Sequence, residues 1–176
     1  NYSTYSYKKN LGFSYNLKNI YSIYKIIFTW YYSLRHLSNQ NKSTINIMEV
    51  GCGGGDYLVL LKKYINLLSG YEVQTTGIDF NCPKREGIDH SISGDISNLK
   101  IKENNYDLVI CYQLIEHVSN PKKVLKKMIN SLSISGTLII ETPYLKSVDA
   151  SIIKKRFWAG WHAPRHWVDR KSTRLN

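Results

Sequence analysis

The stretch INIMEVGCGGGD, residues 45–56, decides how the chain is expected to fold. Its first half, Ile45–Val50, is a short apolar run of the kind that forms a buried strand. The glycine-rich segment Gly51–Gly55 follows, and Asp56–Asn66 then has the apolar spacing of a helix. Glycines let a backbone turn tightly and approach a ligand closely. The stretch therefore predicts a strand, a ligand-binding loop and a helix in succession.

Strand and helix signals continue to alternate toward the C-terminus. The further expected elements are a strand at Glu72–Asp79, a short strand at Ser91–Ser93, a strand at Tyr106–Cys111, a helix at Pro121–Leu132, a turn at Ser133–Gly136 and a strand at Thr137–Thr142. Such alternation is typical of α/β domains with right-handed crossovers. The sequence therefore predicts a Rossmann-like, doubly wound, mostly parallel sheet with helices on both faces.

The N-terminal segment, residues 1–44, has a different character. Residues 1–16 are rich in Tyr, Ser and Asn and predict irregular structure. From Leu17 to Leu37, apolar and aromatic residues recur at steps of three and four, which predicts an amphipathic helix. Lys18, Lys25 and Arg35 flank this apolar stripe. We expect this helix to face the core or to form a lid. Because basic side chains flank its apolar stripe, a helix that lies on a membrane surface is the alternative.

The composition limits the classes of protein to be considered. The chain has 176 residues, of which 43% are hydrophobic, and its formal net charge is +11. This length suits one domain, and no apolar run is long enough to predict a membrane span. Residues 1–46 contribute +6 and residues 47–150 contribute −1. Because the excess charge lies on the flanks, we do not expect nucleic-acid binding.

The cysteines give no sign of a metal site or a disulfide framework. Cys52, Cys82 and Cys111 are few, odd in number and without C-x-x-C spacing. We therefore expect no bound metal and a reducing, cytoplasmic setting.

Acidic residues follow two of the expected strands. Asp79 ends one strand, and Asp95 lies in the step Gly94-Asp95-Ile96 after the next. In doubly wound sheets, ligands bind at the carboxyl ends of the strands. Asp79 could accept two hydrogen bonds from a ribose diol, while Asp95 could accept from an adenine amino group and Ile96 could pack on the ring. Together with the glycine loop, these residues predict a nucleoside-type ligand.

The glycine loop departs from the dinucleotide fingerprint G-x-G-x-x-G/A. Counting from Gly51, the sixth position is Asp56, which would place a carboxylate near a pyrophosphate. A nucleoside without a phosphate therefore fits better. An NAD(P)-dependent Rossmann oxidoreductase is the enzymatic alternative, and a basic protein that binds nucleic acid or a membrane surface is the non-enzymatic one.

The segment Ile47–Gly55 resembles motif I of class I S-adenosylmethionine-dependent methyltransferases, in which an acidic residue precedes a G-x-G-x-G loop. The segment Tyr106–Pro121 resembles the family's next conserved region, which carries an L-E-H element. The resemblance implies an enzyme that transfers a methyl group from S-adenosyl-L-methionine to a small-molecule or lipid-like acceptor. It implies that the residues binding the cofactor are Glu49, Gly51, Gly53, Gly55, Asp79, Asp95, Ile96 and Tyr112.

Acid–base candidates lie in two places. His117 belongs to the L-E-H element and is the favoured catalytic residue, since an oxygen nucleophile must lose a proton. The alternative acid–base candidates lie where we expect the methyl acceptor to bind. They are Tyr144 and two histidines of the Trp158–Trp167 cluster, His162 and His166. The cluster predicts either an acceptor site or a packed surface loop.

The C-terminal end carries one further expectation. The last eight residues, 169–176, are similar to a translated sequencing-adapter oligonucleotide, so we expect a non-native tail there. The methyltransferase domain is then expected over residues 45–168, without the two final strands that the resemblance implies.

Overall fold

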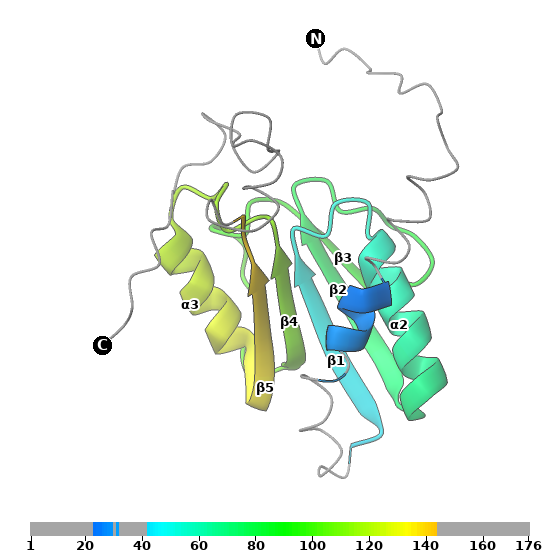
Figure 1. The fold of residues 1–176 in the computed structure, drawn as a ribbon. Coiled ribbons are helices and arrows are strands. Elements are labelled where there is room, and N and C mark those ends of the chain that lie inside the picture. Colours follow the sequence, from blue (N-terminus) through cyan, green and yellow to red (C-terminus); the bar gives the residue numbers. More distant parts are fainter. Residues whose placement is uncertain (1–22, 30, 32–41, 144–176) are drawn as a thin grey trace, which may run out of the picture.

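The computed structural model describes residues 23–29, 31 and 42–143. These residues form one five-stranded sheet in which all neighbouring strands are parallel. The strand order is β3-β2-β1-β4-β5 (Figure 1). In chain order, the elements are β1 Thr44–Val50, α2 Asp56–Ser69, β2 Glu72–Asp79, β3 His90–Ser93, β4 Tyr106–Tyr112, α3 Pro121–Ser131 and β5 Leu132–Glu141. The predicted Rossmann-like sheet is confirmed.

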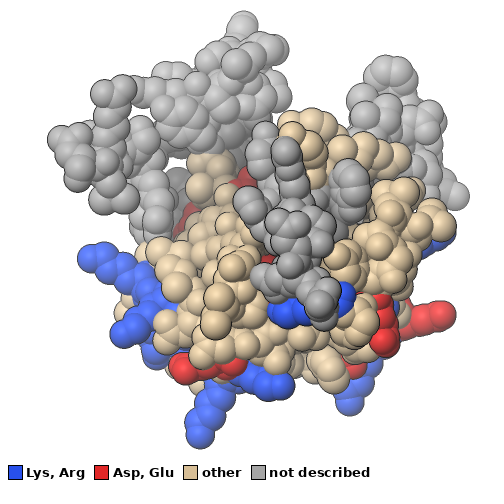
Figure 2. Space-filling model, turned by 90° about the horizontal axis from the view of Figure 1, so that it is seen from below, with Lys and Arg blue, Asp and Glu red and all other residues tan. Residues whose placement is uncertain are grey.

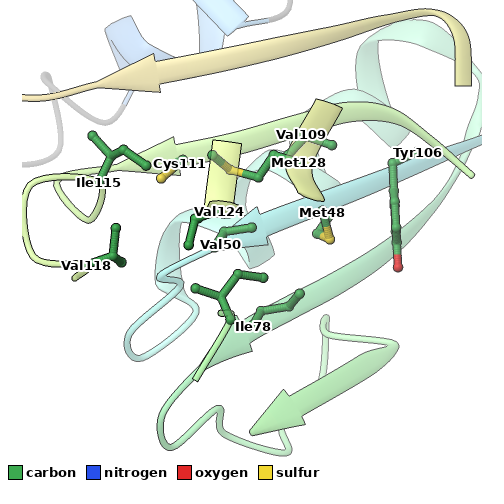
Figure 3. Close-up of a cluster of buried hydrophobic side chains, with 11 residues drawn as sticks. Met48, Val50, Ile78, Tyr106, Val109, Cys111, Ile115, Val118, Val124 and Met128 are labelled. Atoms are coloured by element: carbon green, nitrogen blue, oxygen red, sulfur yellow. The ribbon is translucent and has the colours of Figure 1, made fainter. Parts of the chain in front are cut away.

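Helices cover both faces of the sheet, because successive side chains on each strand alternate between two cores. On one face, Ile45 and Ile47 of β1 pack with Leu58, Leu61 and other residues of α2. On the other face, Met48 and Val50 pack against Val124 and Met128 of α3 (Figure 3). Each of these eight side chains is 0% exposed. A central strand buried on both faces explains why the run at residues 45–50 is so apolar.

The strand order places β1 between β2 and β4, and this is the switch point of the sheet. The register pairs Val50 with Ile78 and Asp79 with Ser93. The loops that follow β1, β2 and β3 therefore leave the sheet at the same edge. The expected ligand-binding residues are thus brought to one end of the molecule.

The predicted turn at Ser133–Gly136 is wrong. These residues lie within β5, which begins directly after α3 at Leu132. Leu132 pairs with Tyr106 and Thr137 pairs with Leu108, so β5 contains an irregularity in register at this point. Ser135 has a left-handed φ of +67°. The turn-like residues are therefore accommodated as a bulge, which lets a strand continue through a local kink.

The predicted amphipathic helix is present over residues 23–29, and the rest of it falls outside the described residues. The apolar stripe that the periodicity predicts is largely exposed in this part, which does not favour the core-facing role over the lid or membrane-surface role. Tyr24 and Ile27 are 62% and 57% exposed, whereas Ile26 is 3% and Thr29 is 0% exposed. Ile26 packs with the α2 core, so the helix turns a different face to the sheet than periodicity alone indicates.

The face of the molecule at which the strands begin carries both basic and acidic side chains, and among the described residues its basic side chains do not gather into one patch (Figure 2). Figure 2 shows Lys and Arg around the margin of this face, with Asp and Glu between them. Within the described ranges, no helix is long and apolar enough to cross a membrane.

Candidate functional site

The glycine loop is fastened to the neighbouring strand by its backbone. The N–H groups of Gly51 and Cys52 both donate to the carbonyl oxygen of Ile78, at 2.7 and 3.1 Å. Gly51 has a left-handed φ of +81°, and a Cβ atom placed on it would lie 3.0 Å from Cβ of Leu114. The loop therefore needs glycine at this position for its conformation and for the close approach of the chain after β4.

Asp79 holds the next part of the loop. Its Oδ2 accepts a hydrogen bond of 2.9 Å from the N–H of Gly53. Its Oδ1 accepts a long hydrogen bond, 3.5 Å, from the N–H of Asn81. The carboxylate thus orders the loop and retains acceptor capacity for a ligand.

A pocket of about 210 Å³ opens beside this carboxylate. It brings together five of the residues predicted from sequence, namely Gly51, Asp79, Asp95, Ile96 and His117. Its other lining residues are Val50, Ile78, Phe80, Gly94, Ser97, Leu114, Val118 and Ser119. Sequence reasoning missed this second group, although most of its members lie directly beside the strand ends that it identified. Glu49, Gly53, Gly55 and Tyr112 do not line this pocket.

The carboxylate of Asp95 is partly engaged by its own turn. Its Oδ1 accepts a hydrogen bond of 2.8 Å from the N–H of Ser97. Its main-chain carbonyl accepts from the N–H groups of Asn98 and Leu99. Oδ2 lies 3.5 Å from the side-chain amide of Asn98, so this oxygen retains acceptor capacity at the pocket. Ile96 is 5% exposed and belongs to the core on the α3 side.

Glu49 lies at the end of β1 and is only 4% exposed. Its Oε2 has no hydrogen-bond partner among the described residues. Burial raises the pKa of Glu49 from its ordinary value of 4.5 to about 8, with Lys25 opposing the rise and Asp79 adding to it. A buried carboxyl group with an unsatisfied oxygen is costly unless a donor reaches it. The site thus holds an acceptor that a ligand ammonium could satisfy.

The raised pKa of Glu49 makes stability depend on pH. Between about pH 4.5 and 8 the folded state keeps a proton that the unfolded state releases. The stabilising contribution is complete below pH 4.5 and is lost as the pH rises toward 8. We expect the wild-type free energy of unfolding to fall by on the order of 1 kcal/mol per pH unit in this interval.

The variant Glu49→Gln is expected to flatten that slope, since an amide does not titrate. Urea unfolding at pH 5, 6, 7 and 8 would measure the slope, with the exposed Glu72→Gln as the matched control. Equal slopes for the wild type and Glu49→Gln would contradict the assignment.

Tyr112, at the end of β4, lies in a second polar cluster on the α2 side. The hydroxyl groups of Thr29, Tyr57 and Tyr112 lie within hydrogen-bond distance of one another, at 2.9, 3.2 and 3.4 Å. Burial raises the pKa of Tyr57, and the neighbouring Tyr112 adds to this effect. The cluster joins helix 23–29 to the first turn of α2 and to β4.

Lys25 places a cation on the face of Tyr112. Its Nζ lies 3.9 Å from the ring centroid and donates to Oε1 of Glu141 at 2.9 Å. Gln113 also donates to this carboxylate oxygen, at 3.1 Å. Tyr112 was predicted to bind the cofactor, and in this structure the ammonium group of Lys25 lies on its ring. Lys25 was missed because its position depends on how helix 23–29 packs.

A second buried carboxyl group follows β4. Glu116 is 3% exposed; its Oε2 accepts from the hydroxyl of Thr142 at 3.3 Å, and its Oε1 has no partner among the described residues. The next residue, His117, is exposed and lines the pocket. Tyr144, His162 and His166, the rival candidates, lie outside the described residues.

Cys52, Cys82 and Cys111 are free and buried in the structure. Sγ of Cys52 and Sγ of Cys82 lie 3.5 Å apart beneath the glycine loop. Burial raises the pKa of Cys52, which disfavours the reactive thiolate. No group of three or more possible metal-binding side chains occurs in the part of the chain that the structure describes.

Comparison with known proteins places this architecture in a family. Residues 29–173 match the family described as "Methyltransferase domain". Norajmaline N-methyltransferase of Rauvolfia serpentina is 29% identical over 112 residues, which cover 57% of this chain and 36% of that protein. The ubiquinone biosynthesis O-methyltransferase of Coxiella burnetii is 27% identical over 100 residues, which cover 55% and 43% of the two chains.

A solved structure shows the same fold. The crystal structure of coclaurine N-methyltransferase, bound to N-methylheliamine and S-adenosylhomocysteine, has a TM-score of 0.54 and 16% identity. The match covers 76% of this chain and 38% of that one. The chain also spans less than half the length of the two curated relatives named above. The chain belongs to the methyltransferase-domain family and has the Rossmann-like fold of class I S-adenosylmethionine-dependent methyltransferases.

Proposed function

We propose that this protein transfers a methyl group from S-adenosyl-L-methionine to a small-molecule acceptor. The observation that carries this proposal is the pocket at the switch point, where the glycine loop meets Asp79 and the Asp95–Ile96 step. Family membership supports the reaction type. When bound, S-adenosylmethionine supplies an electrophilic methyl group on a sulfonium, so no covalent protein nucleophile is required.

The residues present fit the nucleoside half of this cofactor. Asp79 has acceptor capacity for a ribose diol, and Gly53 already donates to its other oxygen. Ile78, Ile96 and Leu114 give the pocket apolar walls on which a purine would pack. The free capacity of Asp95 Oδ2 suits an adenine amino group.

The residues also fit the amino-acid half. Glu49 offers a buried, unsatisfied oxygen at the end of β1, directly before the glycine loop. An ammonium group would satisfy that oxygen and favour the ionised carboxylate. The ring face of Tyr112 is already occupied by the ammonium of Lys25. Glu49 is therefore the acceptor on which this part of the proposal rests.

A catalytic role for His117 is a separate proposal. As an acid–base group, His117 would take the proton from an acceptor hydroxyl or ammonium. Because it lines the same pocket as Asp95 and Ile96, the competing role is contact with the nucleoside. We expect His117→Asn to lower kcat at least about tenfold and to alter the pH dependence of kcat, since a proton-transfer group typically contributes on the order of 10²–10⁴-fold.

A steady-state comparison of kcat and KM for S-adenosylmethionine would separate the two roles of His117. A raised KM with an unchanged kcat and pH profile would overturn the acid–base role. The exposed His90→Asn is a matched control that should change neither parameter.

The alternatives have less support. Asp56 is paired with Arg85 at 2.6 Å, so its charge is partly neutralised and opposes a pyrophosphate less than the sequence alone suggests. The loop still lacks the dinucleotide fingerprint, and residues 29–173 match a methyltransferase family. The basic face expected of a protein that binds nucleic acid is absent from the view in Figure 2 among the described residues.

The names of the relatives indicate which kinds of atom the acceptor could present for methylation. Their names include N- and O-methyltransferases, and one acts in ubiquinone biosynthesis. We therefore propose a small amine or phenol as the acceptor. The test is transfer of a tritiated methyl group from S-adenosylmethionine to panels of tertiary amines and catechols by the full chain. Transfer to one panel supports the proposal, and no transfer to either panel contradicts it.

A further inference from the structure

Lys127, on α3, makes an unusual set of contacts with the turn that follows β3. Its Nζ donates to the main-chain carbonyl oxygens of Ile96, Ser97 and Leu99, at 3.0, 2.8 and 2.6 Å. An ammonium group has three N–H donors, and here each one reaches a different carbonyl. The contact spans about thirty residues of sequence and involves no side chain of the turn.

The turn needs such a partner because it is a helical turn that does not continue. The carbonyl of Asp95 accepts from the N–H groups of Asn98 and Leu99, so the chain makes one turn and then stops. The carbonyls that follow have no helical N–H groups to accept from. A cation at this end of a turn is favourable, and Asp95 Oδ1 holds the opposite end through the N–H of Ser97.

The same turn forms part of the pocket. Asp95, Ile96 and Ser97 all line it, and two of the three residues bonded by Lys127 are among them. The side chain of Ile96 packs in one core with Val124 and Met128 of α3. Helix α3 therefore contacts this wall both through its apolar face and through Lys127.

We propose that Lys127 is a positioning residue that fixes the 95–97 wall of the cofactor pocket from outside, without touching the ligand. This inference rests on the proposed function, because it assigns the nucleoside half of S-adenosylmethionine to that wall. It predicts that the loss of a distant ammonium weakens cofactor binding while the folded sheet persists.

The test compares Lys127→Met with Lys126→Met, an exposed lysine one position earlier on the same helix. Calorimetric titration well below the melting temperature should show S-adenosylhomocysteine binding to Lys127→Met about tenfold more weakly, and to Lys126→Met as to the wild type. Adenosine should lose affinity by the same factor, because the wall faces the nucleoside. If Lys127→Met does not fold, Lys127→Gln, which retains one donor group, should give an intermediate loss.

Hydrogen exchange provides the readout that a general loss of stability would not reproduce. The N–H groups of Asn98 and Leu99 should exchange faster in Lys127→Met, while those of β1 and β4 should be unchanged. Unchanged affinity in Lys127→Met, equal losses in both variants, or faster exchange throughout the sheet would overturn the proposal. If the wild type binds no S-adenosylhomocysteine, the proposed function fails. Hydrogen exchange at the N–H groups of Asn98 and Leu99 would still test whether Lys127 holds the 95–97 wall in place.

Discussion

Replacing Asp79 by alanine is expected to abolish measurable binding of S-adenosylhomocysteine. In the proposed complex the carboxylate accepts two hydrogen bonds from the ribose, and charge-assisted bonds contribute about 1.5–3 kcal/mol each. Asp79 also accepts the N–H of Gly53, so its loss releases the middle of the glycine loop. Together these effects predict a loss of affinity of at least about 100-fold, measured by calorimetric titration.

Two companion variants make the Asp79 result specific. Glu86→Ala removes an exposed acid from the segment that follows β2 and should leave the affinity unchanged. Asp79→Asn keeps a carbonyl oxygen for the Gly53 N–H but loses the charge, so it should melt like the wild type and still bind weakly. Wild-type affinity in Asp79→Ala would show that the ribose contact is misassigned.

Gly55→Ala is expected to cause the largest loss of stability among single changes in the glycine loop. Gly55 has a left-handed φ of +75°, and an added Cβ would overlap Cδ1 of Ile88, the end of a side chain that would have to rotate within the core. Left-handed backbone costs a residue with a Cβ about 1–2 kcal/mol, and overpacking a buried site costs about 1–3 kcal/mol. We therefore expect the free energy of unfolding to fall by about 2–5 kcal/mol in urea titrations.

The loop supplies its own control for this prediction. Gly53 also has a left-handed φ, of +52°, but a Cβ atom there would meet nothing within 4 Å. Gly53→Ala should therefore show only the backbone cost, about 1–2 kcal/mol. Adding Ile88→Val to Gly55→Ala removes the clashing methyl and should recover part of the loss. Equal effects of Gly53→Ala and Gly55→Ala would contradict the steric explanation.

The sheet could be predicted from sequence because local signals and tertiary structure agree there. The apolar run at residues 45–50 is buried on both faces, and three of the four glycines in the loop after it adopt the left-handed conformation that favours glycine. Asp79 and Asp95 could be predicted to lie at one end of the sheet because the carboxyl ends of parallel strands converge at one edge, and both line the same pocket. No knowledge of side-chain packing was needed for these steps.

Other features depend on packing between distant segments, which periodicity does not report. The apolar stripe predicted for helix 23–29 is largely exposed, and Ile26 and Thr29, which lie outside that stripe, contact α2 and β4. Ser133–Gly136 has the composition of a turn, yet it lies inside β5, which pairs with β4 through Leu132 before this segment and through Thr137 after it. The contacts of Lys127 connect α3 to a turn about thirty residues earlier, and its sequence context gives no sign of them.

The chemistry of Glu49 illustrates the same limit in another way. Its place before the glycine loop is visible in the sequence, but its raised pKa arises from burial in the folded sheet. The unsatisfied oxygen is likewise a property of the assembled site. The unsatisfied oxygen is the observation behind the proposed ammonium contact, and like the raised pKa it is visible only in the structure.

The most direct test of the central claim is a calorimetric titration of the full chain with S-adenosylhomocysteine, run beside an identical titration with NAD⁺. The proposed pocket predicts saturable binding of one S-adenosylhomocysteine per chain, with a Kd on the order of 10 μM, and no heat of binding for NAD⁺. Saturable binding of NAD⁺ without binding of S-adenosylhomocysteine would contradict the account.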